Sequence, residues 1–220
     1  MIEKTTFRFL GELEKNNDKV WFEANRSRYE AARDNFKEKV GELINDIGSF
    51  DPDIALLETK NCVFRQNRDI RFSKDKRPYK NNFGAYFNRG GKKINTASYY
   101  LHLEPGKSIF AGGLYDPDAA QLARVRQEID YNLKEWMKIL KDRNFKKNFP
   151  SGLSQASKLS RPPKGYEQTN PALEFLKLKS FTAATMLTNE EVLDKKFHGR
   201  LIHAFKSLKP MLDFLNEAAL

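Results

Sequence analysis

The side chains best suited to binding chemistry gather between Arg68 and Lys80, in the stretch RDIRFSKDKRPYK. An arginine guanidinium binds phosphate or carboxylate through two parallel hydrogen bonds, a lysine adds a point charge, and a tyrosine adds a hydroxyl and a stacking face. Pro78 disfavours helical backbone at Arg77, so the stretch predicts an ordered turn that presents its charges. It therefore indicates an anion site whose expected contacts are Arg68, Arg71, Lys74, Tyr79 and Lys80.

A solvated, charged loop would explain the same stretch without a ligand. In that case Arg71 and Lys80 would pair with acids of a preceding helix, and the expected partners are Glu23, Glu30 and Asp34. The alternation of cations and rings is instead typical of proteins that bind nucleotides or nucleic acids. Both interpretations stay open at this point.

A second group of candidates shares one face of an expected strand. Tyr100, His102 and Glu104 alternate with apolar residues over 97–104. A histidine with a carboxylate two residues away can act as a general base or supply two metal ligands. A half-buried sheet face with a hydrogen-bonded histidine would give the same pattern. Because no third ligand or nucleophile accompanies them, we predict no metal site. We take His102 and Glu104 as acid–base candidates, with Tyr100 as an orienting hydroxyl.

The sequence RPPKGY at 161–166 supplies a third group of candidates. Its two adjacent prolines stiffen the chain, and long loops inside compact domains are often functional. We expect Arg161, Lys164 and Tyr166 to close over a site on the sheet. The alternative is a connecting loop that is merely basic.

Two adjacent glycines, Gly112 and Gly113, fall inside an expected strand. Glycine within a strand marks a bulge or a close backbone approach. Either a ligand or a packed helix would explain such an approach here.

Alternating apolar and polar residues predict the strands that carry these groups. The clearest strand covers 97–104, and the turn at Pro105-Gly106 leads into a return strand over 108–115. Shorter strand-like segments are 61–65, 69–72, 83–88 and, as an edge strand, 181–187. These patterns predict a central, mostly antiparallel sheet of about four strands, roughly 61–115.

Helical periodicity predicts helices on both sides of this sheet in the chain. Apolar residues recur at helical spacing over 20–47, with an interruption near Asn25, and again over 199–218. Irregular, basic sequence over 141–166 predicts a loop. The order of elements argues for a single α+β domain over 1–220. Its expected parts are helices over 1–50, the sheet over 61–115 and helices over 116–220.

Five motifs carry a resemblance to a known family. They are WFEANRSRY at 21–29, RDIRFSKDKRPYKNNFGAYF at 68–87, YYLHLEPGKSIFAGGLYDPD at 99–118, RPPKGY at 161–166 and LKLKSF at 176–181. In this order they resemble the bacterial and fungal family known as domain of unknown function 2461. Where that family has Asp-His-Pro after its RGY-like element, this chain has Gln168-Thr169-Asn170-Pro171. The resemblance supports the fold and the motif boundaries, and it implies no mechanism.

The positive charge is concentrated in two blocks. The formal net charge is +10, and residues 60–93 hold eleven Lys or Arg against two Asp or Glu. Residues 134–179 hold eleven against four, so the rest of the chain is net acidic. A localised basic block is a candidate anion site, whereas diffuse basicity mainly favours solubility.

Composition argues against several classes of protein. No apolar run approaches the roughly 20 residues that a membrane span needs, and the first residues lack the layout of a signal peptide. The single cysteine, Cys62, excludes an internal disulfide. We therefore expect a cytoplasmic protein with no membrane partner.

Together these features predict an anion-binding globular domain for a phosphate-bearing small molecule or nucleotide. They name no reaction, cofactor or oligomeric state, and they leave open whether catalysis follows binding. One alternative is a non-enzymatic nucleic-acid-binding module that uses both basic blocks. The other is a structural or interaction protein whose charges are only solvated.

Overall fold

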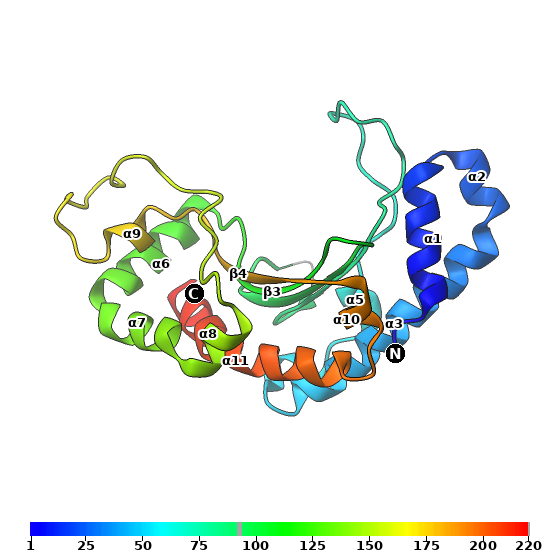
Figure 1. Ribbon diagram of the computed structural model, residues 1–220. Coiled ribbons are helices and arrows are strands. Elements are labelled where there is room, and N and C mark those ends of the chain that lie inside the picture. The colour runs from blue at the N-terminus through cyan, green and yellow to red at the C-terminus, as the bar shows by residue number, and fades with distance from the viewer. Residues whose placement is uncertain (92–93, 220) are drawn as a thin grey trace. The chain divides into compact units, whose positions relative to one another are not determined.

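The structure is a computed structural model that describes residues 1–91 and 94–219, and the chain forms two compact units (Figure 1). Unit 1 comprises Met1–Lys93, Tyr100–Phe110 and Met186–Ile202; unit 2 comprises Ile94–Tyr99, Ala111–Thr185 and His203–Leu220. The single domain expected over 1–220 stays a prediction.

Four strands form one antiparallel sheet. They are β1 (Phe83–Phe87), β2 (Ser98–Leu103), β3 (Ser108–Leu114) and β4 (Phe181–Leu187), and they lie in the order β1-β2-β3-β4. The predicted α+β class, with a sheet flanked by N-terminal and C-terminal helices, is confirmed. Three strands come from the expected region 61–115, and the fourth is the predicted edge strand.

The two strand-like segments at 61–65 and 69–72 were wrongly predicted as strands. Asn61 and Cys62 end the short helix α5 (Thr59–Cys62), and Val63 makes only an isolated bridge to Ala85. Residues 69–72 lie at the turn of a hairpin, where no neighbouring strand is available to pair with them. A short apolar pattern without a partner strand does not form a sheet.

The helices of unit 1 begin and end at local sequence signals. They are α1 (Lys4–Lys15), α2 (Lys19–Ala24), α3 (Arg26–Gly48), α4 (Pro52–Ala55), α5, α10 (Asn189–Leu193) and the start of α11 (Phe197–Ala219). Asp18 caps α2 by accepting a hydrogen bond from the Trp21 amide at 2.9 Å. Asn25 separates α2 from α3, so the predicted interruption is confirmed.

Aromatic rings form the core of unit 1. The Phe22 ring contacts the Tyr29 ring in a tilted arrangement with centroids 4.8 Å apart, and Tyr29 reaches Phe83 of β1 at 6.5 Å. Phe36 of α3 stacks on the same Phe83 ring at 5.4 Å. Because large rings bury much apolar area and hold defined geometries, they fix α3 against β1.

Unit 2 contains most of α11 and four further helices. They are α6 (Ala119–Tyr131), α7 (Leu133–Lys141), α8 (Arg143–Asn148) and α9 (Leu173–Leu176). The predicted loop over 141–166 is therefore partly wrong, because α8 occupies its beginning. Asp142 caps α8 by accepting from the Asn144 and Phe145 amides at 2.8 and 3.0 Å, and Phe145 is buried. The cap and the buried ring both stabilise this short helix.

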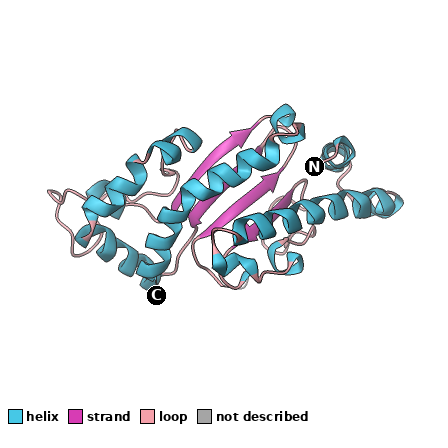
Figure 2. Ribbon diagram, turned by 90° about the horizontal axis from the view of Figure 1, so that it is seen from below, coloured by secondary structure: helices cyan, strands magenta, loops and turns pink. Residues whose placement is uncertain are grey.

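The core of unit 2 surrounds Trp136, whose ring contacts Phe175, Phe181 and Phe214 at 6.2, 6.3 and 5.0 Å between centroids. The part of α11 in unit 2 lies against the strands (Figure 2), and its Phe205 contacts Tyr99 at 5.2 Å. Among the residues that the structure describes, no helix is long and apolar enough to cross a membrane.

Strand pairing and helix packing account for the two glycines in β3. A β-carbon on Gly112 would lie 2.6 Å from Leu208 Cδ1 of α11 and 2.9 Å from the Ser98 carbonyl oxygen. A β-carbon on Gly113 would lie 2.0 Å from the Phe181 carbonyl oxygen of β4. The sequence left open whether a ligand or a packed helix approaches this backbone. At Gly112 it is a packed helix, α11.

Candidate functional site

Three polar side chains of β2 and the residue after it form a hydrogen-bonded relay in unit 1. The Tyr100 hydroxyl lies 3.1 Å from His102 Nδ1, and His102 Nε2 lies 2.9 Å from Glu104 Oε2. An ionised carboxylate only accepts hydrogen bonds, so His102 Nε2 carries a hydrogen and donates a hydrogen bond to Glu104. In the neutral imidazole Nδ1 then accepts from Tyr100. We call Tyr100, His102 and Glu104 the relay.

Glu104 is the fixed end of the relay. Its Oε1 accepts from Asn81 Nδ2 at 3.2 Å and from Lys107 Nζ at 3.2 Å, and the Glu104 side chain is only 13 % exposed. Burial raises the pKa of Glu104, but hydrogen bonds and charges from His102 and Lys107 outweigh it, so the pKa lies below its ordinary value. Glu104 therefore stays ionised and orients the imidazole.

The basic stretch of the sequence is a hairpin-shaped loop that projects from unit 1 (Figure 1), and one antiparallel bridge, between Asn67 and Tyr79, joins its two sides. We call residues 65–80 the arm. The Arg68 amide donates to the Pro78 carbonyl and the Lys80 amide to the Gln66 carbonyl, both at 2.9 Å. These two backbone hydrogen bonds join the two sides of the arm near its base and hold the charged segment in place.

Tyr79 anchors the base of the arm. Its ring stacks on Phe22 with centroids 3.9 Å apart and planes 13° apart. Asn17 accepts from the Tyr79 amide and donates to its carbonyl, both at 3.0 Å. Tyr79 is buried, and burial raises the pKa of its hydroxyl. Its observed contacts are therefore those of a packing residue.

Three arginines of the arm pair with acids of the arm itself. Arg71 pairs with Asp69 at 2.7 Å, while Arg68 and Arg77 both pair with Asp75 at 2.7 Å. Lys74 is exposed near the turn. The alternative pairing of Arg71 with the acids of α2 and α3 does not occur, because Asp69 lies two residues away and takes the guanidinium.

Lys80 is the predicted cation that the structure brings close to the relay. It is half-buried, and its Nζ lies 5.3 Å from the centroid of the Phe64 ring. The same ring contacts Tyr100 edge-on at 6.4 Å. The pKa of Lys80 is lowered, mainly by burial and to a smaller extent by the positive charge of Arg65. Within residues 1–91 and 94–219, no carboxylate pairs with Lys80, so the pairing with Glu23, Glu30 or Asp34 does not occur.

Arg65 was not among the anion contacts expected from the sequence, although its charge acts on Lys80. Gln66 pairs with Lys80 across the hairpin, which places Arg65 beside it. A hairpin that pairs Gln66 with Lys80 would have been the signal, because Arg65 directly precedes Gln66 in the chain. Arg65 is exposed and its charge affects the pKa of Lys80.

Gly84 of β1 sets the position of Tyr100, and we predict that Gly84→Ala weakens unit 1. A β-carbon there would lie 3.1 Å from the Tyr100 hydroxyl and 3.3 Å from Phe64 Cδ2. The added methyl must push the ring aside, which costs about 1–2 kcal/mol of unfolding free energy in a well-packed site. Urea unfolding measures this loss.

The matched control is Gly11→Ala in α1. Nothing lies within 4 Å of the added methyl there, so better helix propensity should raise stability by about 0.5–1 kcal/mol. Equal stabilisation by both substitutions would show that Tyr100 is not held against Gly84.

The candidates of the RPPKGY loop belong to unit 2. Arg161 and Lys164 are exposed, and Tyr166 lies near Arg126 and Asp130 of α6. The pKa of the Tyr166 hydroxyl is raised. Burial is the larger cause, and the charge of Asp130 adds to it. Whether this loop closes over the sheet stays a prediction.

Arg126 is a second residue that the sequence did not single out. Burial lowers the pKa of its guanidinium. Its Nη2 donates to the Leu178 carbonyl at 3.1 Å, but its Nε is buried without a hydrogen-bond partner. The signal in the sequence was weak: one arginine among several polar residues of an amphipathic helix.

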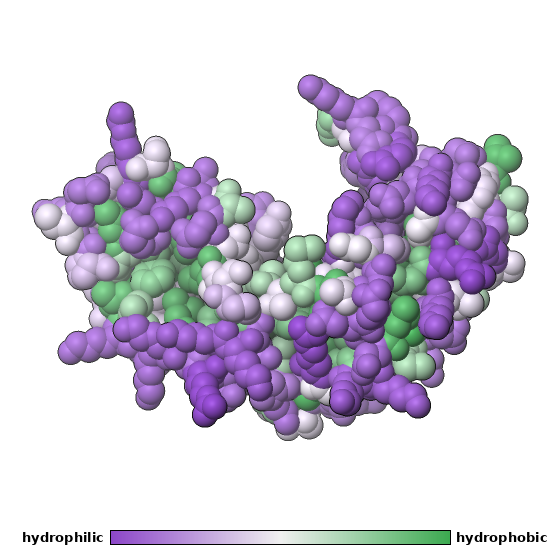
Figure 3. Space-filling view, viewed as in Figure 1, coloured by the Kyte–Doolittle hydropathy of each residue, from purple (hydrophilic) through white to green (hydrophobic). Residues whose placement is uncertain are grey.

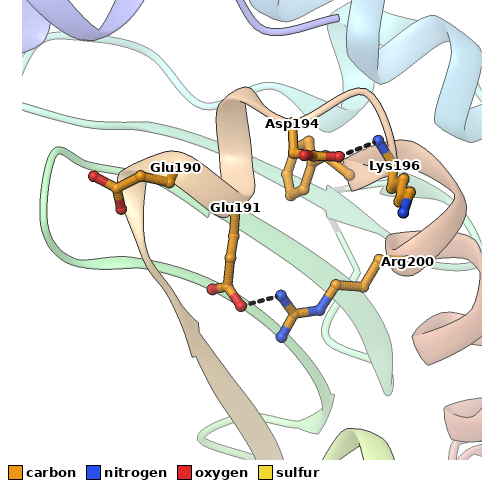
Figure 4. Close-up of a pocket in the computed structure, with 6 residues that line it drawn as sticks. Glu190, Glu191, Asp194, Lys196 and Arg200 are labelled. Atoms are coloured by element: carbon orange, nitrogen blue, oxygen red, sulfur yellow. Dashed lines mark hydrogen bonds and ion pairs between the residues drawn. The ribbon is translucent and has the colours of Figure 1, made fainter.

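A pocket of about 340 Å³ lies in unit 1 between α10 and the start of α11 (Figure 4). Arg200 pairs there with Glu191 at 2.5 Å, and Asp194 accepts from the Lys196 amide at 2.7 Å. Glu190 adds a third acid. Because its acids outnumber its cations and Arg200 is already paired, this pocket does not suit an anion.

In the part of the chain that the structure describes, no group of three or more His, Cys, Asp or Glu side chains could hold a metal ion.

A family model described as Conserved hypothetical protein (DUF2461) matches residues 5–214. No curated protein and no solved structure matches the chain.

Proposed function

The chain belongs to the DUF2461 family, whose description names no activity, and we propose from the geometry of unit 1 that it binds a phosphate-bearing small molecule or nucleotide. The observation that carries this proposal is Lys80: a half-buried cation that no carboxylate of the described residues pairs with, packed on the ring that also contacts Tyr100.

Phosphate suits this place because it relieves an electrostatic cost. Burial and the nearby charge of Arg65 both disfavour the protonated form of Lys80. An anion between the two cations would stabilise both, and a phosphate has enough oxygens to accept from each. A monovalent carboxylate would neutralise only one of them. We therefore favour phosphate over carboxylate as the ligand group.

The relay gives this site a base. A ligand hydroxyl at Tyr100 can pass its proton to the tyrosine oxygen while the tyrosine proton moves to His102 Nδ1. The ligand loses one proton, His102 becomes an imidazolium, and Glu104 stabilises that charge through Nε2–H. The relay has the order hydroxyl, imidazole, carboxylate, which supports an enzymatic role beside simple binding.

The test is a thermal-shift titration with inorganic phosphate, nucleoside monophosphates and sugar phosphates. We expect the wild-type protein to gain thermal stability with at least one of them, because a ligand that binds only the folded state stabilises it. Lys80→Met should remove that gain. The matched control is Lys195→Met, which removes the same charge from an exposed position of unit 1 outside the arm and should leave the gain unchanged.

Two results would contradict the proposal. One is the absence of any shift for the wild-type protein with every phosphate compound. The other is an equal loss in both lysine variants, which would show that overall positive charge, and not a site at Lys80, attracts the anion.

A further inference from the structure

An aromatic ring at the turn of the arm has no role in the packing of unit 1. Phe72 is 95 % exposed, and the guanidinium carbon of Arg71 lies 5.8 Å from the ring centroid. Single exposed apolar side chains are common on protein surfaces and need no partner. Phe72 differs from the ordinary case because it stands at the end of an ordered and strongly basic hairpin.

The charge of the arm is suited to a polyanion. Residues 65–80 hold seven Lys or Arg and two Asp, a net charge of +5. Both acids are occupied by arginines of the arm. Lys74 and Lys76, next to Phe72, have no carboxylate partner among the described residues. The projecting arm is accordingly mostly hydrophilic on the face shown in Figure 3.

The arm is ordered before any partner binds. Backbone hydrogen bonds join its two sides, Lys76 Nζ donates to the Ile70 carbonyl at 3.0 Å, and Arg68 Nη1 donates to the Arg77 carbonyl at 3.1 Å. Tyr79 fixes its base against Phe22. A preorganised surface loses less conformational entropy on binding than a flexible basic tail would.

We propose that the arm binds single-stranded nucleic acid, with an unpaired base stacked on Phe72 and neighbouring phosphates at Lys74 and Lys76. Any base can stack on an aromatic face, and cations beside the ring hold the backbone without reading the sequence. In a duplex the bases are already stacked on one another, so the ring would have nothing to cover. A membrane-binding surface would need a continuous apolar face, whereas Phe72 is one ring among cations.

Base stacking at Phe72 does not depend on the phosphate site at Lys80. Phe72, Lys74 and Lys76 lie at the turn of the arm, whereas Lys80 and Arg65 lie at its base. Phe72→Ala should therefore keep the thermal shift with phosphate compounds. Lys80→Met should remove that shift and leave base stacking on Phe72 intact.

The experiment is fluorescence anisotropy with a labelled single-stranded oligothymidine at low salt. Phe72→Ala should weaken binding by about tenfold or more, because one stacked base is lost. The matched control is Tyr115→Ala, which removes an aromatic ring that is 68 % exposed outside the arm and should leave the affinity unchanged. Both variants should keep the melting temperature of the wild-type protein, since neither ring is buried.

Salt dependence tests the phosphate contacts. For Lys74→Met we expect the slope of log affinity against log salt to become shallower by about 0.7, the value for one lost contact to a single strand. Three results with oligonucleotides would overturn the proposal: no binding at low salt, equal affinity of wild type and Phe72→Ala, or tighter binding to the duplex of the same sequence. Binding to phosphatidylserine vesicles that depends on Phe72, without oligonucleotide binding, would also overturn it by assigning the arm to a membrane.

Discussion

Gly113→Ala is expected to separate β3 from β4 and to cost about 4 kcal/mol or more of unfolding free energy. The new β-carbon would lie 2.0 Å from the Phe181 carbonyl oxygen and 2.8 Å from Thr182 Cα, both of which are backbone atoms. No side-chain rotation relieves such a clash, so one strand has to move and lose its hydrogen bonds. The φ angle of +128° adds strain for any residue with a β-carbon.

The control for Gly113→Ala separates strain from clash. Gly152 also lies in unit 2 with a positive φ, +64°, but nothing lies within 4 Å of an added β-carbon. Gly152→Ala should therefore cost only the left-handed backbone, about 1–2 kcal/mol. Urea unfolding followed by far-ultraviolet circular dichroism measures both variants. A loss for Gly113→Ala no larger than that for Gly152→Ala would mean that β3 and β4 do not approach as closely as described.

The strands with local partners could be predicted from the sequence. Alternating polarity and the turn at Pro105-Gly106 define β2 and β3, whose connection is short. The pairing of β4 with β3 could not be predicted in the same way, because it joins segments separated by the whole of α6 to α9. A strand's pattern shows which face is buried, but it does not identify a distant neighbour.

The same limit applies to the candidate site. A two-residue period was enough to place Tyr100, His102 and Glu104 on one face, and their side chains are indeed hydrogen-bonded to one another. The approach of Lys80 to this face depends on the register of the arm and on Phe64, which no local pattern reveals. The ion-pair partner of Arg71 depended on distance along the chain. Asp69, two residues away, pairs with Arg71 instead of an acid of a preceding helix.

Glu104→Gln is expected to destabilise unit 1 at neutral pH by about 1.5–3 kcal/mol, the range for hydrogen bonds to a charged group. Glu104 accepts from three donors, on His102, Asn81 and Lys107. A glutamine amide has one acceptor oxygen and one donor group. In either orientation its NH₂ faces a donor, so the hydrogen bonds on one side of the carboxylate are lost.

The pH dependence of this loss has a definite sign. The pKa of Glu104 in the folded protein lies below its ordinary value of 4.5, so its ionised form is stabilised by folding. That contribution is fully present above pH 4.5 and is lost as the pH falls through the lower folded pKa. The difference in unfolding free energy between wild type and Glu104→Gln should therefore be constant near neutral pH and shrink in acid.

Glu174→Gln is the matched control for this pH series. Glu174 also pairs with a lysine, Lys158, and the pair lowers its pKa, but its side chain is 71 % exposed. Exposed ion pairs contribute little, so we expect a change below about 1 kcal/mol at every pH. Urea unfolding of both variants from pH 7 to pH 3 measures the series. A loss for Glu104→Gln that does not change with pH would show that the carboxylate's charge does not hold the relay. The same conclusion would follow if the two variants lost equal stability, because then burial and the three donors would add nothing to an ordinary surface pair.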